Sequence, residues 1–407
     1  MLIKTRIPTE SVEIGMFVVE LDRPWIDVPL MFQKFIVKSE RELKVLNDYC
    51  KYVYIEVEDK YWQAHKARLT GVYKLSRLPE NTPIHHELPR AQSAYFTARD
   101  HAVKLIADIQ ASNNGRIDLE DSKRVIRSCI SSILSNANAL FWLTRVKNKD
   151  HYTAEHSLRV AILSIALGKF LGMNNDELEL LGLCGLLHDI GKTQIPKDIL
   201  NKPGKLSDVE IRVIQKHSIL GFELISPDHT IDPIIKDVIK NHHKRIDGDG
   251  YPKQIDGETL TVYCRIISII DTYDTITSDT CYKQGQSPRE ALKELFNQRD
   301  KQFDGKLVEA FIKMMGIYPA GSLVEMSNGE VGIVISTDPD KKLSPKVELV
   351  RDKMGKLKKP LIIDLTKSPN DQYGQPYFIK TALPDGSMGI DMQRSIQDSH
   401  HIHKMQS

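Results

Sequence analysis

The spacing of apolar positions divides the chain into a β-rich start, a long helical middle and a β-rich end. Residues 17–21 and 52–57 are short runs of β-branched and aromatic residues between turn residues, which predicts two strands. Residues 40–49 lie between them and carry Leu43 and Leu46 at helical spacing, which predicts one helix. The first 60 residues are therefore expected to form a small α+β domain.

Helical periodicity dominates the middle of the chain. In the first of these segments Ala102, Leu105 and Ile109 recur at a spacing of three to four residues, and an Asn-Asn-Gly break follows at 113–115. The same pattern predicts helices over 91–111, 119–143, 154–171, 176–188, 207–225, 232–243, 262–278, 288–298 and 304–315. Residues 71–90 contain proline and histidine without periodicity and are typical of a linker.

The period changes again after residue 318. Residues 322–326, 331–336 and 347–349 alternate like strands, and Asn328-Gly329 is typical of a tight hairpin turn. The domain organisation expected from these patterns is 1–65 β-rich domain, 66–90 linker, 91–316 helical domain, 317–366 β-rich extension and 367–407 polar tail. Histidines 400, 401 and 403 lie in that tail, where a frayed terminus is favoured over a metal site.

Composition narrows the class of protein. The 407 residues are 41% hydrophobic and 27% charged, as in ordinary globular proteins. The net charge is only +2, which gives no electrostatic argument for DNA or an anionic membrane as a partner. No apolar run reaches the length of a membrane-spanning helix, and the first residues lack the apolar core of a signal peptide. Five cysteines without CxxC spacing argue against a disulfide framework and a cysteine zinc site. These features predict a cytoplasmic protein.

Histidines and aspartates that could hold metal gather between residues 150 and 280. Asp189 follows a buried-type helix, and Asp271 comes directly after the apolar run 266–270. A buried carboxylate without a partner costs several kcal/mol, so each of these is expected to have a cation partner. Imidazole and carboxylate ligands together suit iron, manganese or zinc. Five of the 14 histidines lie on or near helix faces in this region: His156, His188, His217, His242 and His243.

A carboxylate has two oxygen atoms and can bridge two cations, whereas a histidine cannot. Asp189, with histidines expected on both sides, is the natural bridge. Each of these residues alone would usually be accidental, but their joint occurrence within about 120 residues at helix ends and in apolar runs favours one metal centre.

Several of these residues belong to motifs that resemble the HD-GYP family over about residues 90–316. The motifs are His188-Asp189-Ile190-Gly191-Lys192, Lys202-Pro203-Gly204-Lys205-Leu206, His217, His242-His243, Asp247-Gly248-Asp249-Gly250-Tyr251-Pro252 and Asp271-Thr272-Tyr273-Asp274. The first 60 residues are similar to the small domain of unknown function that often precedes HD-GYP domains in bacteria. Residues 317–365 are similar to the extension that follows them.

The resemblance implies a fold and an activity. The fold would be mainly α, an HD-type all-helical bundle with a small α+β N-terminal domain and a small β-rich C-terminal extension. The activity would be a metal-dependent phosphodiesterase that hydrolyses cyclic di-GMP, or the related 3′,3′-cyclic GMP-AMP, to a linear dinucleotide. The reaction would be an in-line attack by a metal-bridging hydroxide, for which no nucleophilic side chain is needed.

The resemblance also implies roles for particular residues. Two divalent ions, iron or manganese, would share seven ligands: His156, His188, Asp189 and Asp271 on one ion, and Asp189, His217, His242 and His243 on the other. The catalytic residues would be Asp189 and Lys192, with Lys192 near the scissile phosphate. Substrate contacts would come from Gly250, Tyr251, Pro252 and Lys283.

Three positions depart from the family pattern. Lys244 follows the histidine pair, where the family usually has glutamate. Thr280 replaces an arginine expected to contact the nucleotide, although Lys283 keeps the second basic contact. Tyr152 stands where members with a third metal carry an acidic ligand, so two metals are expected.

Two other functions remain open on the sequence. One is a catalytically weak HD-GYP domain that binds a cyclic dinucleotide and signals through protein contacts, which Lys244 and Thr280 favour. The other is a general HD nucleotide phosphohydrolase, which leaves residues 250–252 unexplained. The complete ligand set favours the phosphodiesterase. The expected partner is the cyclic dinucleotide; signalling proteins and a homodimer remain open, and neither DNA nor membrane is expected.

Overall fold

The chain forms two compact units, Met1–Lys74 and Leu75–Ser407. The boundary falls inside the segment 66–90 that was expected to be a linker. The computed structural model describes residues 2–14, 16–23, 28, 35–37, 39–58, 75–112, 117, 119–145, 152–253, 260–278, 285–338, 341, 343–383 and 387–390.

In its described residues the N-terminal unit is a four-stranded antiparallel sheet with the α-helix α1 and the short helix η1. The strand order is β1-β4-β2-β3. Its elements are β1 (Leu2–Pro8), η1 (Thr9–Ser11), β2 (Phe17–Leu21), β3 (Phe35–Ile36), α1 (Glu40–Tyr49) and β4 (Tyr52–Glu58). The two predicted strands and the predicted helix are confirmed. Ser39 and Glu42 form a capping box that begins α1.

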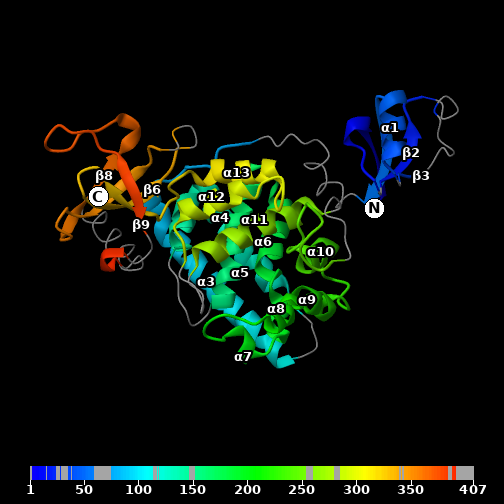
Figure 1. Cartoon of the computed structure of the whole chain (residues 1–407), viewed down its shortest axis with the longest axis horizontal. Coiled ribbons are helices and arrows are strands. Elements are labelled where there is room, and N and C mark those ends of the chain that lie inside the picture. The colour runs from blue at the N-terminus through cyan, green and yellow to red at the C-terminus, as the bar shows by residue number, and fades with distance from the viewer. Residues whose placement is uncertain are drawn as a thin grey trace. The chain divides into compact units, whose positions relative to one another are not determined.

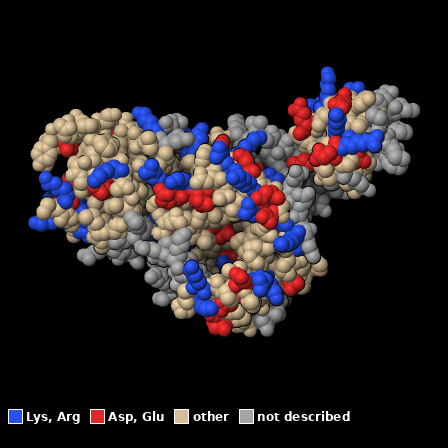
Figure 2. Space-filling model, in the orientation of Figure 1, with Lys and Arg blue, Asp and Glu red and all other residues tan. Residues whose placement is uncertain are grey.

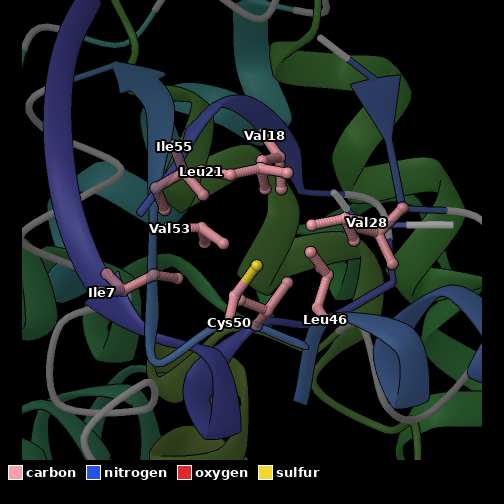
Figure 3. Packing of buried hydrophobic residues seen from close by; sticks show 10 residues of the cluster. Ile7, Val18, Leu21, Val28, Leu46, Cys50, Val53 and Ile55 are labelled. Carbon is pink, nitrogen blue, oxygen red and sulfur yellow. The ribbon is translucent and has the colours of Figure 1, made fainter. Parts of the chain in front are cut away.

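A small hydrophobic core holds this unit together (Figure 3). Val18 on β2, Leu46 on α1 and Val53 on β4 are fully buried in it. Because these residues come from elements on both sides of the core, the helix and the sheet stabilise one another.

The second unit is dominated by helices, and the mainly α HD-type fold expected from the sequence is confirmed (Figure 1). Its helical elements are α3 (Ile84–Ser112), α4 (Leu119–Leu143), α5 (Tyr152–Phe170), α6 (Asn175–Leu187), η3 (Ile190–Gln194), α7 (Lys197–Leu200), α8 (Asp208–Gln215), α9 (His217–Ile225), α10 (Pro233–Asn241), α11 (Val262–Thr277), α12 (Pro288–Asn297) and α13 (Gly305–Met315). None of the helices within the described residues is both long and apolar enough to cross a bilayer.

Helix α5 lies at the centre of the bundle and contacts α3, α4, α6, α11 and α13. It is buried on nearly every side, as expected for a helix that is apolar all round. Its crossing with α6 is very close, because a Cβ atom on Gly185 would lie 2.6 Å from the Cα atom of Ala161. This close crossing brings the end of α6 beside the first half of α5.

Two helical segments differ from the sequence prediction. Helix α3 begins at Ile84, so residues 84–90, expected in the linker, are helical. Pro89 removes one backbone hydrogen bond there, but Leu88 and Ala91 are buried and the buried Glu87 accepts a hydrogen bond from Ser132 Oγ. The helix predicted over 207–225 is divided into α8 and α9.

The division occurs at Lys216. Its N–H donates to the carbonyl of Val213, three residues back, which tightens the turn. The next residue, His217, therefore begins α9.

A five-stranded antiparallel sheet with the order β8-β7-β6-β5-β9 follows the helices. Its strands are β5 (Leu323–Met326), β6 (Val331–Ser336), β7 (Lys346–Arg351), β8 (Leu357–Asp364) and β9 (Ile379–Leu383). The three predicted strands and the hairpin turn at Asn328-Gly329 are confirmed. Residues 379–383, expected in the polar tail, form β9.

Strand β8 was missed because several of its apolar residues are exposed, and β9 is only five residues long. Leu357, for example, is 77% exposed, so apolar and polar positions do not alternate clearly. Histidines 400, 401 and 403 lie outside the described residues.

Candidate metal centre

The seven residues expected to bind metal come together from five parts of the helical unit. They fall into two groups of potential ligand atoms: Asp189, His217, His242 and His243 in one, and His156, His188 and Asp271 in the other. Most of them stand where a helix begins or ends. His188 and His242 follow the last residues of α6 and α10, and His217 begins α9.

Asp189 lies between the two groups and turns one oxygen atom toward each. Its Oδ2 atom is 3.4 Å from Nε2 of His156 and 3.4 Å from Nε2 of His188. Its Oδ1 atom is 3.2 Å from Nε2 of His217 and 3.9 Å from Nε2 of His242. This is the arrangement expected of a carboxylate that bridges two cations.

Asp271, on α11, extends the first group. Its Oδ1 atom lies 3.1 Å from Nε2 of His156 and 3.8 Å from Nε2 of His188. Its Oδ2 atom is 3.8 Å from Nδ1 of His243, which belongs to the second group. Both carboxylates therefore contact histidines of both groups.

The backbone fixes the orientation of three histidine rings. In His188, His217 and His242 the Nδ1 atom faces a carbonyl oxygen, so Nδ1 carries the hydrogen and Nε2 presents its lone pair to the centre. The accepting oxygens are those of Gly185 at 2.8 Å, Ile214 at 2.7 Å, and Val238 and Ile239 at 3.1 Å each. The Nε2 atoms of His217 and His242 are only 3.3 Å apart. With both Nδ1 atoms protonated, two lone pairs face each other here, an arrangement that a cation between them would stabilise.

Unsatisfied atoms at the centre fit the same conclusion. Among the described residues, Nε2 of His188 and Oδ1 of Asp189 are buried without a hydrogen-bond partner. Leaving such groups unpaired is costly, and a divalent cation would satisfy both. The mixture of imidazole nitrogen and carboxylate oxygen donors suits a borderline transition metal.

The pKa values favour the protonation state that metals need. Burial lowers the pKa of His188 and His217, and it lowers that of His243 to about 3. Burial raises the pKa of Asp189, but the Lys192 ammonium and the surrounding histidines outweigh it and hold this pKa well below its usual value. These histidines are thus neutral and Asp189 is ionised at neutral pH, as ligands must be.

His156 is the exception. Burial lowers its pKa, but hydrogen bonds to the carboxylates of Asp189, Asp271 and Asp274 outweigh burial and raise the pKa well above the usual value. In the metal-free protein His156 therefore carries a proton among three carboxylates. A cation bound there would take the place of that proton.

Lys192 reaches the centre from the short helix η3, where its Nζ atom donates a hydrogen bond to Oδ2 of Asp189. Its side chain is 21% exposed and therefore accessible to a ligand. The approach depends on Gly191, because a Cβ atom there would lie 1.9 Å from the carbonyl oxygen of His217.

The segment 250–252 lies against the second group of ligands. Gly250 has a positive φ of 85°, and a Cβ atom there would be 2.2 Å from the carbonyl oxygen of His243. The ring of Tyr251 packs against His243, with ring centres 4.5 Å apart, and edge-on against His217 at 6.1 Å. Pro252 follows Tyr251 through a cis peptide bond. This segment therefore walls one side of the centre.

Of the three positions that depart from the family pattern, the structure describes Lys244 and Tyr152. Lys244 is 2% exposed, and its Nζ atom has no hydrogen-bond partner among the described residues. The ring of Tyr152 lies parallel to that of His156, with centres 5.9 Å apart. Thr280 and Lys283 lie outside the described residues.

No role was assigned from the sequence to two residues of the centre, Arg159 and Asp274, although Asp274 ends one of the motifs. Asp274 accepts a hydrogen bond from Nδ1 of His156 at 2.7 Å, and Arg159 pairs with Asp274. The available signal was spacing: Arg159 follows His156 by three residues, and Asp274 follows Asp271 by three, so each lies on the same helix face as a ligand.

In space-filling view a hollow opens in the helical unit, over α5 and α6 as labelled in Figure 1, and acidic and basic atoms are visible inside it (Figure 2). Charged atoms in a hollow of a helical bundle are the setting in which such folds bind ligands and metals.

Three known sequence families match successive parts of the chain. Residues 4–129 match a domain of unknown function (DUF3391), residues 137–307 match the HD domain, and residues 323–383 match a KOW domain associated with the HD domain. The HD fold with its histidine–aspartate cluster defines the class, that of metal-dependent HD-domain hydrolases.

Individual relatives narrow this class. The chain is 32% identical over 372 residues to the cyclic di-GMP phosphodiesterase PA4108 of Pseudomonas aeruginosa. This match covers 89% of each chain. It is 35% identical over 159 residues to 3′3′-cGAMP-specific phosphodiesterase 1 of Vibrio cholerae, covering 38% of this chain and 36% of that protein. It is 31% identical over 169 residues to the cyclic di-GMP phosphodiesterase response regulator RpfG of Xanthomonas campestris, covering 41% and 45%. The chain belongs to the HD-GYP family.

Among solved structures, the HDG"Y"P protein Bd1817 of Bdellovibrio bacteriovorus matches 76% of this chain and 98% of its own, with 19% identity and a TM-score of 0.47.

Proposed function

We propose that this protein hydrolyses a cyclic dinucleotide, cyclic di-GMP or 3′,3′-cyclic GMP-AMP, to the linear dinucleotide. The observation that carries the proposal is Asp189, which directs one oxygen toward each of two histidine groups. The names of the three relatives support the substrate class, since all three are phosphodiesterases of cyclic di-GMP or cyclic GMP-AMP.

The chain would hold two divalent cations, iron or manganese, each on a set of four ligands that share Asp189. The first set is His156, His188, Asp189 and Asp271, and the second is Asp189, His217, His242 and His243. When bound, a pair of such cations lowers the pKa of water and offsets negative charge on a phosphate group.

Lys192 and Tyr251 would both act on the substrate. The Lys192 ammonium is held beside Asp189 by a hydrogen bond and is partly exposed, so it can stabilise charge that develops on the phosphate oxygens. Tyr251 and its neighbours Gly250 and Pro252 would bound the substrate, because the tyrosine ring covers His243 and His217. Lys283 would supply a second basic contact.

The test is product analysis on the full chain loaded with Mn²⁺ or, without oxygen, with Fe²⁺. Both cyclic dinucleotides are assayed in parallel by chromatography. We expect at least one of them to yield the linear dinucleotide, and only when metal is present. Two bound metals and tight dinucleotide binding without any linear product would contradict the proposal and favour the signalling module instead.

A further inference from the structure

The four buried histidines that turn Nε2 toward the centre are not held in the same way. For three of them Nδ1 donates to a neutral backbone carbonyl. For His156 the acceptor is the Asp274 carboxylate, at 2.7 Å. A carboxylate acceptor fixes the ring and makes the opposite nitrogen a stronger metal donor than a neutral carbonyl does. His156 is thus the most strongly activated of the four.

Asp274 cannot easily turn away from His156. Nε of Arg159 donates to its Oδ1 atom at 2.7 Å, and Nη2 donates to its Oδ2 atom at 2.9 Å. The side chains of His156, Arg159 and Asp274 are all 4% exposed or less. A bidentate pair of this kind, closed to water, holds one orientation of the carboxylate.

The two halves of the centre also differ in charge and in exposure. The half that contains His156 has the Asp271 carboxylate in addition to its share of Asp189. The other half has three histidines and its share of Asp189, and Asp271 approaches it less closely, at 3.8 Å from His243 against 3.1 Å from His156. His243 in that half is 25% exposed, whereas His156 is 2% exposed. Anionic, buried ligands hold a divalent cation more strongly than neutral, partly exposed ones.

We propose that Asp274, oriented by Arg159, is a positioning residue that makes the His156 half the tighter of the two metal sites. The two metals therefore bind in order, first beside His156 and then beside His243, and leave in the reverse order. This inference rests on the two-metal site of the proposed function, but it concerns metal affinity and needs no substrate.

The experiment is a calorimetric titration of the metal-free full chain with Mn²⁺ alone. The wild type should bind two ions per chain in two separable steps. Asp274→Asn, which keeps the size of the side chain but weakens the acceptor, should weaken the first step by about 10- to 100-fold. His243→Ala should remove the second step and leave the first unchanged.

Asp274→Asn leaves Arg159 buried without its carboxylate partner, which could prevent folding. The double variant Arg159→Met/Asp274→Asn removes both charges of this pair, while Glu155, whose Oε2 atom lies 3.6 Å from Nη1 of Arg159, has a further partner. This variant should fold and show the same weakened first step. Asp237→Asn is the matched control. Asp237 accepts hydrogen bonds from Asn241 at 2.8 Å and Thr261 at 3.2 Å in the same unit, and its substitution should leave both steps unchanged.

An unchanged first step in the double variant would overturn the inference, as would two equal sites in the wild type. An equal loss in Asp237→Asn would overturn it too, because the effect would then be general destabilisation. The proposed function can fail separately: two ordered Mn²⁺ steps without hydrolysis would contradict only the activity, and hydrolysis with two equal sites would contradict only this inference.

Discussion

Some residues of this centre belong to local sequence motifs, and others are brought in by the packing of distant helices. The sequence predicts only the first kind. The histidines and aspartates that meet around Asp189 could be named beforehand, because motifs at short spacing carry them. Arg159 and Asp274 could not be paired, since they are more than 100 residues apart and meet only where α5 packs against α11. A sequence shows which residues share a helix face but not which face lies opposite.

Lys192 gives a prediction at this scale. Lys192→Ala should lower kcat/KM by roughly 100- to 1,000-fold, because one cationic donor to the phosphate is lost. The metal content should stay at the wild-type level, since all seven ligands remain. Steady-state kinetics and elemental analysis measure the two quantities.

The control is Lys197→Ala on the short helix α7, where the lysine is exposed. Its kinetics should match the wild type. If Lys192→Ala lost metal in proportion to activity, Lys192 would be a structural support for Asp189 and not a group that acts on the substrate.

At the scale of elements, amphipathic spacing and capping residues predicted most helices to within a few residues. Asn174 and Ser207 accept backbone hydrogen bonds that begin α6 and α8, as such residues commonly do. The start of α3 was missed because its stabilising contacts are tertiary, from Glu87 to Ser132 on α4. Strand β8 was missed because its exposed apolar residues break the alternation, and β9 is a short strand of five residues.

At this scale we predict that the close contact between η3 and α9 contributes to the stability of the fold. In Gly191→Ala the new Cβ atom would lie 1.9 Å from the His217 carbonyl oxygen and 2.5 Å from the Gly221 amide nitrogen. The two elements must separate, which should cost about 3 kcal/mol of unfolding free energy and move Lys192 and His217. Thermal or denaturant unfolding measures the loss.

Gly204→Ala separates packing from backbone effects. Gly204 has a φ of +90°, but its Cβ position has no atom within 4 Å. Alanine there should cost only backbone strain, about 1–2 kcal/mol. Equal losses in the two variants would show that close packing at Gly191 is not what holds η3 against α9.

For the whole molecule, the sequence predicted a mainly helical body between two β-containing parts, and this fold class is confirmed. The resemblance predicted this fold class because its motifs, from His188 to Asp274, belong to a known helical domain. The two compact units and the exact reach of the last sheet depended on contacts between distant segments, such as β5 with β9, which a local pattern does not contain.

The charge of the site as a whole determines which product should accumulate. A second cleavage requires the linear dinucleotide to return with a terminal phosphate, whose extra negative charge needs further cations. Tyr152 lies flat beside His156 and cannot serve as an acidic ligand for a third metal, and Thr280 carries no charge. We therefore expect the linear dinucleotide to accumulate in a time course. Mononucleotide that formed without a lag would show that the site holds the terminal phosphate well.

Substrate preference is also set by the whole site. Because Thr280 lacks the forked guanidinium of arginine, Thr280→Arg should raise kcat/KM for cyclic di-GMP relative to 3′,3′-cyclic GMP-AMP. The ratio of the two kcat/KM values measures this preference directly. An unchanged ratio would mean that position 280 does not contact the nucleotide.

The most direct test of the whole account joins metal content and turnover in one variant, Asp189→Ala. Asp189 turns one oxygen toward each ligand group at 3.2–3.4 Å, whereas Asp271 comes no closer than 3.8 Å to His243 of the second group, so the loss of Asp189 should weaken both metal sites at once. The measurement is elemental analysis of the purified variant, with formation of linear dinucleotide assayed on the same sample. The account predicts that metal content and turnover fall together. A variant that kept two metals per chain would contradict the assignment of Asp189 as the bridge.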